Sequence, residues 1–292
     1  MISDRVFSTE FGSLYQGDCI EWMHSLQANS IDLIFADPPF NLKKDYGENI
    51  RDDLTVEEYI SWSYKWLDAA IPLLTKGGAI WIYNIPRWNI VLGAYLMQKT
   101  ELLFRHQVAV SLTMGLPIPG KLSPTHYSLL YFTKGKPRYF KRPRTPIEVC
   151  RHCGREIKDY GGHRNKMNPE GVNLTDVWTD ICPVRHRKTK HRVANALPEK
   201  MLERILTIST QEGDVVLDPF GGSGTTYAVA ERMKRKWLGI ELGDVDPIIR
   251  RLQGQTANFE MPLRGDAGKG ISKPKMRTKQ IKSKEPLSLS LF

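Results

Sequence analysis

The sequence predicts an α/β fold in which a mostly parallel β-sheet is covered by helices on both faces. Strand-like and helix-like segments alternate from residue 13 to residue 133, and the same alternation resumes after residue 193. The chain has 292 residues and is 41% hydrophobic, which is enough for one large domain with an insertion or for two modest domains. The interruption between residues 135 and 192 is typical of one fold that is split by an insertion.

The first block contains three segments with clear periodicity. Residues 18–26 are expected to form a helix, and residues 30–40 a buried strand that ends in a Pro-Pro turn. Residues 55–74 carry apolar side chains at helical spacing. Thr55 and Glu58 have the spacing of a capping box, which predicts the start of this helix.

The remaining elements are predicted from the same periodicities. A Lys-Gly-Gly turn at residues 76–78 is expected to lead into the next strand. In chain order we expect a strand over 79–85, a strand over 126–134, an amphipathic helix over 196–210, a strand over 213–220, a glycine-opened helix over 221–233, and a strand over 236–242 that ends in an acid.

The positive charge of the chain is concentrated in one stretch. The net charge is +10, and residues 134–192 contain sixteen Lys or Arg against six Asp or Glu, a surplus of ten that equals the whole excess. Such a concentration favours a surface that faces a polyanion, and nucleic acid is the commonest polyanion. A solvated basic loop without a ligand fits the charge equally well.

The composition argues against membrane and secreted classes. No run of about 18 apolar residues occurs, and the N-terminus lacks the basic and apolar regions of a signal peptide. The four cysteines do not form the pattern of a disulfide framework, so a reducing setting is expected. We therefore expect a soluble cytoplasmic protein with no membrane partner.

Asp37-Pro38-Pro39-Phe40 stands at the end of an expected strand, where open α/β sheets bind ligands. An exocyclic amino group of a nucleobase is a poor nucleophile because its lone pair is delocalised into the ring, and hydrogen-bond acceptors at its N–H groups activate it. Asp37 offers a carboxylate, Pro38 a carbonyl stiffened by two prolines, and Phe40 a face for stacking. A sharp strand-to-loop turn is the alternative interpretation of these four residues.

A glycine-rich segment, residues 218–226, follows another expected strand and opens a helix. Its glycines let the backbone approach a ligand closely, and the helix N-terminus offers free N–H groups. The pattern fits neither the dinucleotide fingerprint nor the P-loop. Glu241 ends the next strand, where an acid binds ribose hydroxyls in other nucleoside-binding folds; an ordinary surface acid is the alternative.

These two motifs, DPPF and DPFGGSGTT, together resemble those of the DNA amino-methyltransferases, which methylate adenine N6 or cytosine N4. Their order is similar to the β-class arrangement, and the resemblance extends over residues 14–252. It implies a Rossmann-like S-adenosylmethionine-dependent methyltransferase fold with a reversed terminal hairpin. An aspartate at the head of DPPF favours adenine, and residues 197–204 resemble the helix beside the methionine moiety of the cofactor.

The resemblance also assigns roles to individual residues. The implied catalytic residues are Asp37, Pro38, Pro39 and Phe40. The residues implied to bind S-adenosyl-L-methionine are Asp18, Asp218, Phe220, Gly222, Gly224, Thr225 and Glu241. Methyl transfer from a sulfonium needs no metal and no catalytic thiol, so neither is expected in the active site.

We divide the chain into four parts. Residues 1–134 form the catalytic half, 135–192 the inserted basic target-recognition region, 193–262 the cofactor-binding half, and 263–292 a basic tail that is expected to be disordered up to its apolar end. In the inserted region, the expected contacts with DNA phosphates come from Arg185, Arg187 and Lys188.

Cys150 and Cys153 have the C-x-x-C-G spacing of a zinc knuckle. Further zinc ligands would have to come from His152, His163, Cys182, His186 or His191. Because no second C-x-x-C occurs, two reduced loop cysteines remain the alternative interpretation, and no metal is assigned.

The chain closes with apolar residues after a Lys-rich stretch. Residues 287–292, from Leu287 to Phe292, resemble the short peptide with which bacterial proteins bind the replication sliding clamp. Packing of these side chains onto the enzyme's own core is the alternative.

The sequence therefore predicts a methyltransferase that acts on a base rotated out of double-stranded DNA, with adenine N6 favoured and cytosine N4 as the alternative. A nucleic-acid-binding module that keeps the fold without activity is a candidate from another class. Methylation of RNA or of a protein glutamine amide is a further alternative, because the planar amino group of these substrates is also a poor nucleophile.

Overall fold

The computed structural model describes residues 5–43, 52–112, 119–120, 122–150, 152–156, 160–181 and 196–254. All of them lie within one compact unit, residues 1–256. Among the described residues, none of the helices has the length and apolar character needed to cross a membrane.

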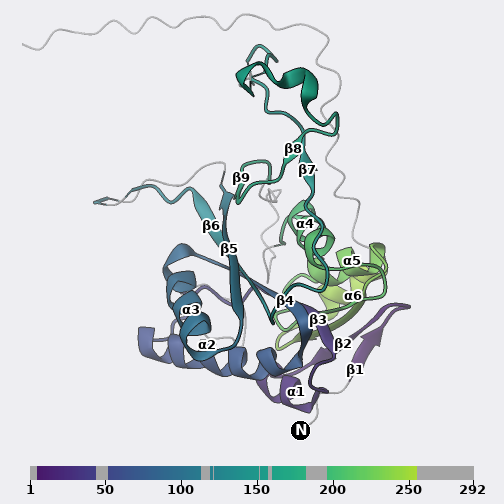
Figure 1. Cartoon of the computed structure of the whole chain (residues 1–292). Helices are drawn as coiled ribbons and strands as arrows, with labels where there is room; N and C mark the ends of the chain where they lie inside the picture. The colour runs from purple at the N-terminus through teal and green to yellow at the C-terminus, as the bar shows by residue number, and fades with distance from the viewer. Residues whose placement is uncertain are drawn as a thin grey trace, which may run out of the picture. The chain divides into compact units, whose positions relative to one another are not determined.

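The described residues form a nine-stranded sheet in the order β1-β2-β11-β10-β3-β4-β6-β5-β9 (Figure 1). The strands are β1 Arg5–Ser8, β2 Gly12–Gln16, β3 Ile31–Ala36, β4 Leu74–Asn84, β5 Leu103–Ser111, β6 His126–Thr133, β9 Val177–Trp178, β10 Val215–Asp218 and β11 Lys236–Glu241. Within this sheet of the described residues, the pairs β1–β2, β4–β6 and β5–β6 are antiparallel and the other five are parallel. The predicted mostly parallel sheet is confirmed, and β6 supplies the reversed strand that the resemblance implied.

Helices cover both faces of this sheet. The helices are α1 Cys19–Ser25, α2 Val56–Ala70, α3 Pro86–Lys99, α4 Glu199–Ser209, α5 Thr225–Arg232 and α6 Asp246–Leu252, with short 3-10 turns at Ile71–Leu73, Tyr160–Gly162 and Arg164–Lys166. Met23, Trp66 and Leu96 of α1, α2 and α3 share one buried cluster with Ile34 and Ile80 of the sheet. The helices α4, α5 and α6 pack on the opposite face, in a second cluster.

The start of α2 agrees with the predicted capping box. The Thr55 hydroxyl accepts from the Glu58 N–H at 3.2 Å, and the Glu58 carboxylate accepts from the Thr55 N–H at 2.9 Å. The predicted turn at residues 76–78 is wrong, because these residues lie inside the long strand β4. Gly77 has φ +80° there, and a side chain on it would meet the Arg138 nitrogen at 2.7 Å. The glycine therefore serves a close approach of two chain segments, not a turn.

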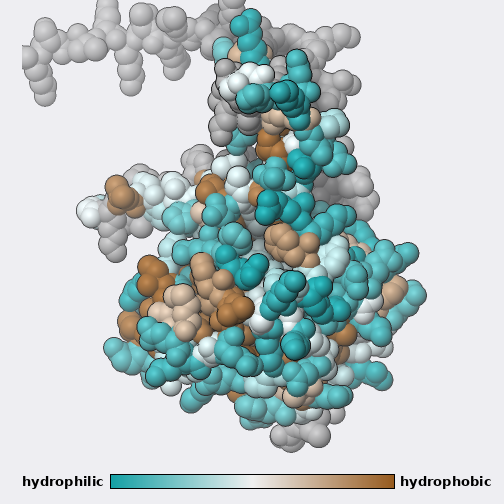
Figure 2. Space-filling view, in the orientation of Figure 1, coloured by the Kyte–Doolittle hydropathy of each residue, from teal (hydrophilic) through white to brown (hydrophobic). Residues whose placement is uncertain are grey.

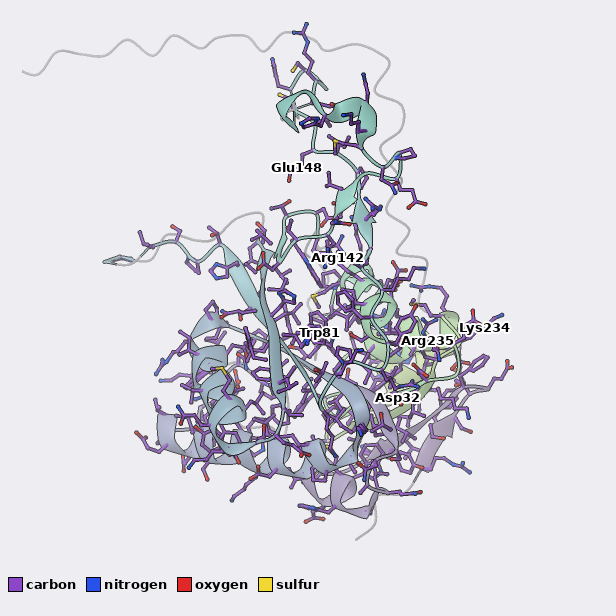
Figure 3. The ribbon with its side chains drawn as sticks, in the orientation of Figure 1. Asp32, Trp81, Arg142, Glu148, Lys234 and Arg235 are labelled. Atoms are coloured by element: carbon purple, nitrogen blue, oxygen red, sulfur yellow. The ribbon has the colours of Figure 1, made fainter. Side chains whose placement is uncertain are left out.

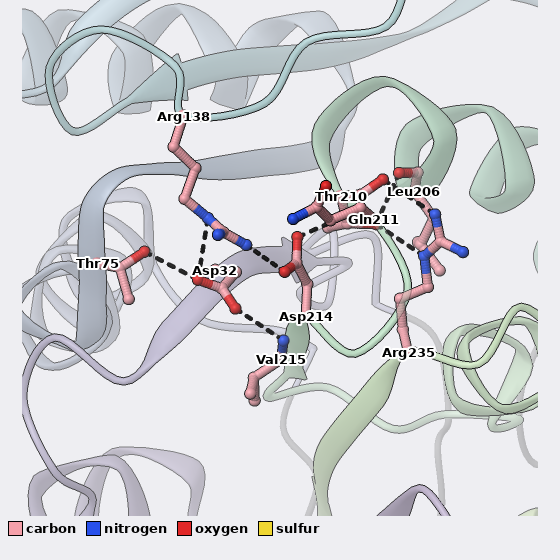
Figure 4. Close-up of polar contacts among 9 residues, drawn as sticks. All are labelled: Asp32, Thr75, Arg138, Leu206, Thr210, Gln211, Asp214, Val215 and Arg235. Carbon is pink, nitrogen blue, oxygen red and sulfur yellow. Dashed lines mark hydrogen bonds and ion pairs between the residues drawn. The ribbon is translucent and has the colours of Figure 1, made fainter.

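An ion-pair cluster joins the chain after β6 to the starts of three strands (Figure 4). The Arg138 guanidinium lies 3.2 Å from the Asp32 carboxylate at the start of β3 and pairs also with Asp214, just before β10. Asp32 accepts in addition from the Thr75 hydroxyl at 3.1 Å and from the Val215 N–H at 2.9 Å. Residue 138 is therefore fixed at the amino ends of these strands, the edge opposite Asp37 and Asp218.

Further contacts tie described parts of the inserted region to α4 and to the sheet. The Lys141 N–H donates to the Ile208 carbonyl at 3.0 Å, and β9 pairs with β5 at the edge of the main sheet. Helix α4 is in turn held against the sheet, because the indole of Trp81 in β4, which Figure 3 labels, donates to the Ser209 hydroxyl of α4 at 2.8 Å. Between these anchors, a separate two-stranded sheet is formed by β7 Arg144–Thr145 and β8 Val172–Asn173. The wider boundaries of 135–192 stay a prediction.

The surface differs between the parts of the fold. Figure 2 shows hydrophobic residues gathered over α3 and the adjoining end of β5, where Met97, Leu103 and Phe104 are exposed. The surface over the segment that contains β7 and β8 is mainly hydrophilic in the same view. The hydrophilic character of that segment agrees with its Lys- and Arg-rich sequence.

Candidate active site at the carboxyl edge of the sheet

Two motifs of the sequence meet at the switch point of the sheet. The strands β3 and β10 pair in parallel, with Leu33 beside Val216, and both end at the same edge. The helix after β3 covers one face and the helix after β10 covers the other. In open α/β sheets, ligands bind where successive helices diverge in this way. Asp37 follows one of the two strands and Asp218 ends the other, so the fold brings the two predicted motifs together.

A wall of aromatic side chains lies beside Asp37. Phe40 is only 8% exposed, and its ring centroid lies 5.6 Å from that of Tyr127 and 6.0 Å from that of Tyr83. Burial raises the pKa of both tyrosines, and the negative charge of Asp37 raises each further. The charge of Asp37 thus acts on both hydroxyl groups. Tyr83 and Tyr127 were missed by the sequence reasoning because they belong to other strands and to no recognised motif.

The backbone after Asp37 is held by buried donors from two helices. The Tyr59 hydroxyl donates to the Pro39 carbonyl at 2.7 Å, and the Trp88 indole donates to the Phe40 carbonyl at 2.7 Å. The side chains of Tyr59 and Trp88 are 2% and 3% exposed. The two carbonyls are thus directed into the protein.

The glycine-rich loop contains backbone conformations and packing that favour glycine. Gly222 and Gly224 have φ values of +51° and +70°, and Gly224 is the N-cap of α5. A side chain on Gly224 would meet the Ile248 side chain at 2.7 Å. Phe220 packs against α2, with its ring centroid 5.3 Å from that of Trp66. The backbone N–H groups at the start of α5 have no side-chain cap.

Two acids next to this loop are partly or fully buried. Burial raises the pKa of Asp218 to about 7, although hydrogen bonds from Thr226 and the Phe220 N–H oppose the shift. Burial also raises the pKa of Glu241. The Glu241 carboxylate accepts from the Gly222 N–H at 2.6 Å and from the Gly243 N–H at 2.9 Å. Glu241 therefore shapes the glycine loop in addition to any ligand it binds.

Asp18 lies at the same edge, after β2. One of its oxygens caps α1 by accepting from the N–H groups of Ile20 and Glu21 at 2.9 and 3.0 Å. The next residue, Cys19, has a pKa raised to about 12 by burial and by the charges of Asp18 and Glu241. Cys19 is thus near both acids, and its thiol is protonated at neutral pH.

The cysteine pair of the inserted region lies in a short turn. An antiparallel bridge joins Val149 to Glu156, and the Gly154 N–H donates to the Cys150 carbonyl at 2.8 Å. Hydrogen bonds from the backbone N–H groups of Cys153 and His152 lower the pKa of Cys150. In the described parts of the chain, no group of three or more His, Cys, Asp or Glu side chains is placed to hold a metal.

Several predicted residues lie outside the described residues. They are Arg185, Arg187 and Lys188, the possible ligands Cys182, His186 and His191, and the apolar end from Leu287 to Phe292. Their proposed roles stay predictions.

Comparisons with known proteins match most of the chain. The family model described as DNA methylase matches residues 31–245. The type II methyltransferase M.BamHI of Bacillus amyloliquefaciens is 54% identical over 250 residues, which cover 85% of this chain and 59% of the relative. The type II methyltransferase M.HpaI of Haemophilus parainfluenzae is 32% identical over 83% of this chain and 74% of its own length. This chain thus spans less than two thirds of M.BamHI.

Solved structures show the same fold at lower identity. The PvuII DNA methyltransferase, described as cytosine-N4-specific, superposes with a TM-score of 0.63 at 18% identity and covers 88% of this chain and 91% of its own. A putative DNA modification methylase of Thermus thermophilus, in complex with S-adenosyl-L-methionine, superposes with a TM-score of 0.54 at 21% identity, covering 84% and 96%.

Proposed function

This chain belongs to the DNA methylase family, and from that membership we propose that it transfers a methyl group from S-adenosyl-L-methionine to an exocyclic amino nitrogen of double-stranded DNA. The observation that carries the proposal is the pairing of β3 with β10, which brings Asp37 and the glycine loop to one edge of the sheet. Asp37 is the acceptor that the amino group requires, and the loop is the backbone surface that a nucleoside cofactor requires.

The residues at the glycine loop fit this cofactor. A side chain at Gly224 would collide with Ile248, so the packing at the start of α5 requires a glycine there. The N-cap position of α5 has no side-chain cap, so the first N–H groups of this helix can donate to a ligand. S-adenosyl-L-methionine supplies a methyl group on a positively charged sulfonium, which is itself the leaving group. The residues that we propose to bind it are Asp18, Asp218, Phe220, Gly222, Gly224, Thr225 and Glu241. Asp218 and Glu241 place negative charge beside the loop, which favours a cation.

Asp37 and Pro38 would act on the amino group itself. The Asp37 carboxylate accepts one N–H and the Pro38 carbonyl accepts the other, which draws the nitrogen lone pair out of the ring and directs it at the methyl group. Phe40, Tyr83 and Tyr127 form the apolar side of the pocket for a base rotated out of the duplex. Positioning and polarisation are then the main contributions to the rate.

The base is the finer part of the proposal. Asp37 at the head of the motif favours adenine N6, while two acceptors for two N–H groups serve cytosine N4 in the same way. Nucleoside mass spectrometry of duplex DNA incubated with the protein and labelled cofactor separates the two products. If N6-methyladenine is the labelled product, adenine is the target base, and if N4-methylcytosine is the labelled product, cytosine is the target base. If the DNA is bound tightly but stays unlabelled, the protein is a nucleic-acid-binding module without activity.

Substrate class is tested in the same assay. Duplex DNA, single-stranded RNA and a glutamine-containing protein are compared at equal concentrations of acceptor groups. We expect label in the duplex alone. Label in RNA or protein with none in DNA contradicts the proposed substrate and leaves methyl transfer itself intact.

A further inference from the structure

The segment after Asp37 has an unusual shortage of backbone donors. Pro38 and Pro39 carry no N–H, so these two residues donate no backbone hydrogen bond. Beyond them, the N–H groups of Asn41 and Leu42 donate to the Asp52 carboxylate at 2.7 and 3.0 Å. Pro39 and Phe40 are held in addition through their acceptors. The carbonyls of Pro39 and Phe40 each accept one bond of 2.7 Å from a side chain of another element.

The bond to Pro39 has a defined direction. The Asn84 oxygen accepts from the Ile85 N–H at 2.7 Å, so its amide nitrogen faces the other way and donates to the Tyr59 oxygen at 3.0 Å. Since the Tyr59 oxygen already accepts this bond, its own proton is left to be donated to Pro39. Burial raises the pKa of Tyr59, so the proton is retained at any physiological pH.

The second donor is part of the same packed group. The Trp88 ring lies 4.4 Å from that of Tyr59, and the Arg87 guanidinium lies 4.5 Å from the Trp88 centroid. The indole of Trp88 has one N–H and that N–H donates to Phe40. Tyr59 comes from α2, Asn84 from the end of β4 and Trp88 from α3, so three elements converge on two adjacent carbonyls.

We propose that Tyr59 and Trp88 are positioning residues for methyl transfer: by fixing the carbonyls of Pro39 and Phe40, they hold Asp37 and the Pro38 carbonyl in the orientation that receives the amino group. This inference rests on the proposed function. Neither side chain touches the reacting atoms. Their effect is on geometry, and a displacement of about 1 Å at a reacting centre lowers rates by about 100-fold.

The test uses Tyr59→Phe and Trp88→Phe, each of which removes a donor and keeps a ring. We expect kcat to fall about 10- to 100-fold in each variant, with the KM values for cofactor and DNA within about twofold of the wild type. The double variant is expected to lose far less than the product of the single losses, because both bonds hold one segment.

Two matched variants control for the loss of a hydroxyl or an indole. Tyr64→Phe makes the same change on the same helix, at a ring that stacks on Tyr95 at 3.8 Å. Trp22→Phe replaces a buried indole on α1, 2% exposed. Both controls are expected to keep the wild-type kcat. Thermal unfolding of all variants establishes that each is folded before kinetics are compared.

The outcomes are distinguishable from a failure of the proposed function. If Asp37→Ala is inactive while Tyr59→Phe and Trp88→Phe both keep kcat within about twofold, the positioning role is overturned. A fall in kcat that the controls share, or a rise in KM without a fall in kcat, overturns it also. If Asp37→Ala instead keeps the wild-type turnover, the proposed active site itself is wrong.

Discussion

Asp37 differs from the other acids at the carboxyl edge in what surrounds it. Asp18 accepts a backbone N–H group at the start of α1, and Asp218 and Glu241 accept N–H groups of the glycine loop, so these acids hold the local shape of the backbone. Asp37 is the acid whose charge raises the pKa of Tyr83 and Tyr127. Because we propose that its carboxylate accepts from the amino group of the base, we expect a change at Asp37 to affect chemistry more than folding.

Asp37→Asn is expected to lower kcat by about 100-fold or more, because a neutral amide is a weaker acceptor for the amino N–H groups. Cofactor affinity and melting temperature are expected to stay near the wild-type values. Single-turnover kinetics, calorimetry and thermal unfolding measure the three quantities. The comparison variant Glu241→Gln is expected to lose cofactor affinity as well, and a wild-type rate in Asp37→Asn counts against a catalytic carboxylate.

At the level of elements, the sequence predicts what local signals specify. The α2 capping box, the strand before Asp37 and the helix after the glycines are all encoded in short stretches, and the structure contains each of them. Helix α3 and strand β5 were not predicted. The helix begins with Pro86 and contains Gly93, and the first half of β5 is exposed, so neither has a clear apolar period. Their formation depends on distant partners.

The same reasoning applies to the candidate site. DPPF and the glycine loop are continuous motifs and were predicted from the sequence. Tyr59, Asn84 and Trp88 belong to three separate elements, so only tertiary packing shows that they converge on Pro39 and Phe40.

The glycine loop gives a prediction about α5. Gly224→Ala adds a side chain at φ +70° and within 2.7 Å of Ile248. We expect cofactor affinity to fall about tenfold or more, because the loop must shift where the cofactor approaches the backbone. Gly213→Ala is the matched control, since φ is +84° there and no atom lies within 4 Å of the added carbon.

Both variants carry the cost of a left-handed conformation, about 1–2 kcal/mol, so both are expected to melt at a lower temperature. Only Gly224→Ala is expected to bind the cofactor more weakly in calorimetry. Equal affinities in the two folded variants would remove Gly224 from the cofactor site.

For the whole molecule, the main feature is that the excess of basic residues and the acids of the candidate active site lie in different parts of the sequence. Residues 134–192 carry the net positive charge, whereas Asp37, Asp218 and Glu241 gather at the carboxyl edge. Charge reversal at Arg185, Arg187 and Lys188 is expected to weaken DNA binding and to lower the slope of log affinity against log salt by up to about three. Fluorescence anisotropy at several salt concentrations measures both quantities.

The control reverses three exposed cations elsewhere in the chain, Lys65, Lys99 and Lys236. We expect this control variant to keep most of the salt slope. The comparison is needed because a loss of slope that depended only on net charge would occur in both triple variants. Identical slopes would assign residues 185–188 to a solvated surface.

The apolar end of the chain is tested by truncation after Glu285. If residues 287–292 bind the sliding clamp, only the full-length chain is retained by immobilised clamp, and the gain for the enzyme is a higher local concentration on newly replicated DNA. If both chains bind the clamp equally and the truncated chain melts at a lower temperature, residues 287–292 pack onto the enzyme's own core instead.

The buried carboxyl of Asp218 has a consequence for cofactor binding. Its pKa of about 7, raised by burial, lies far above the value of about 3.9 for an exposed aspartate. Its contribution to stability is therefore fully present below about pH 4 and is lost as pH rises through about 7. A sulfonium cation near the carboxyl favours the ionised form, so binding is expected to expel about half a proton at about pH 7 and almost none at about pH 9. Titration calorimetry in two buffers of different ionisation enthalpy measures this release, which Asp218→Asn is expected to abolish. Identical binding enthalpies in both buffers at neutral pH would mean that the carboxyl does not respond to the bound cation.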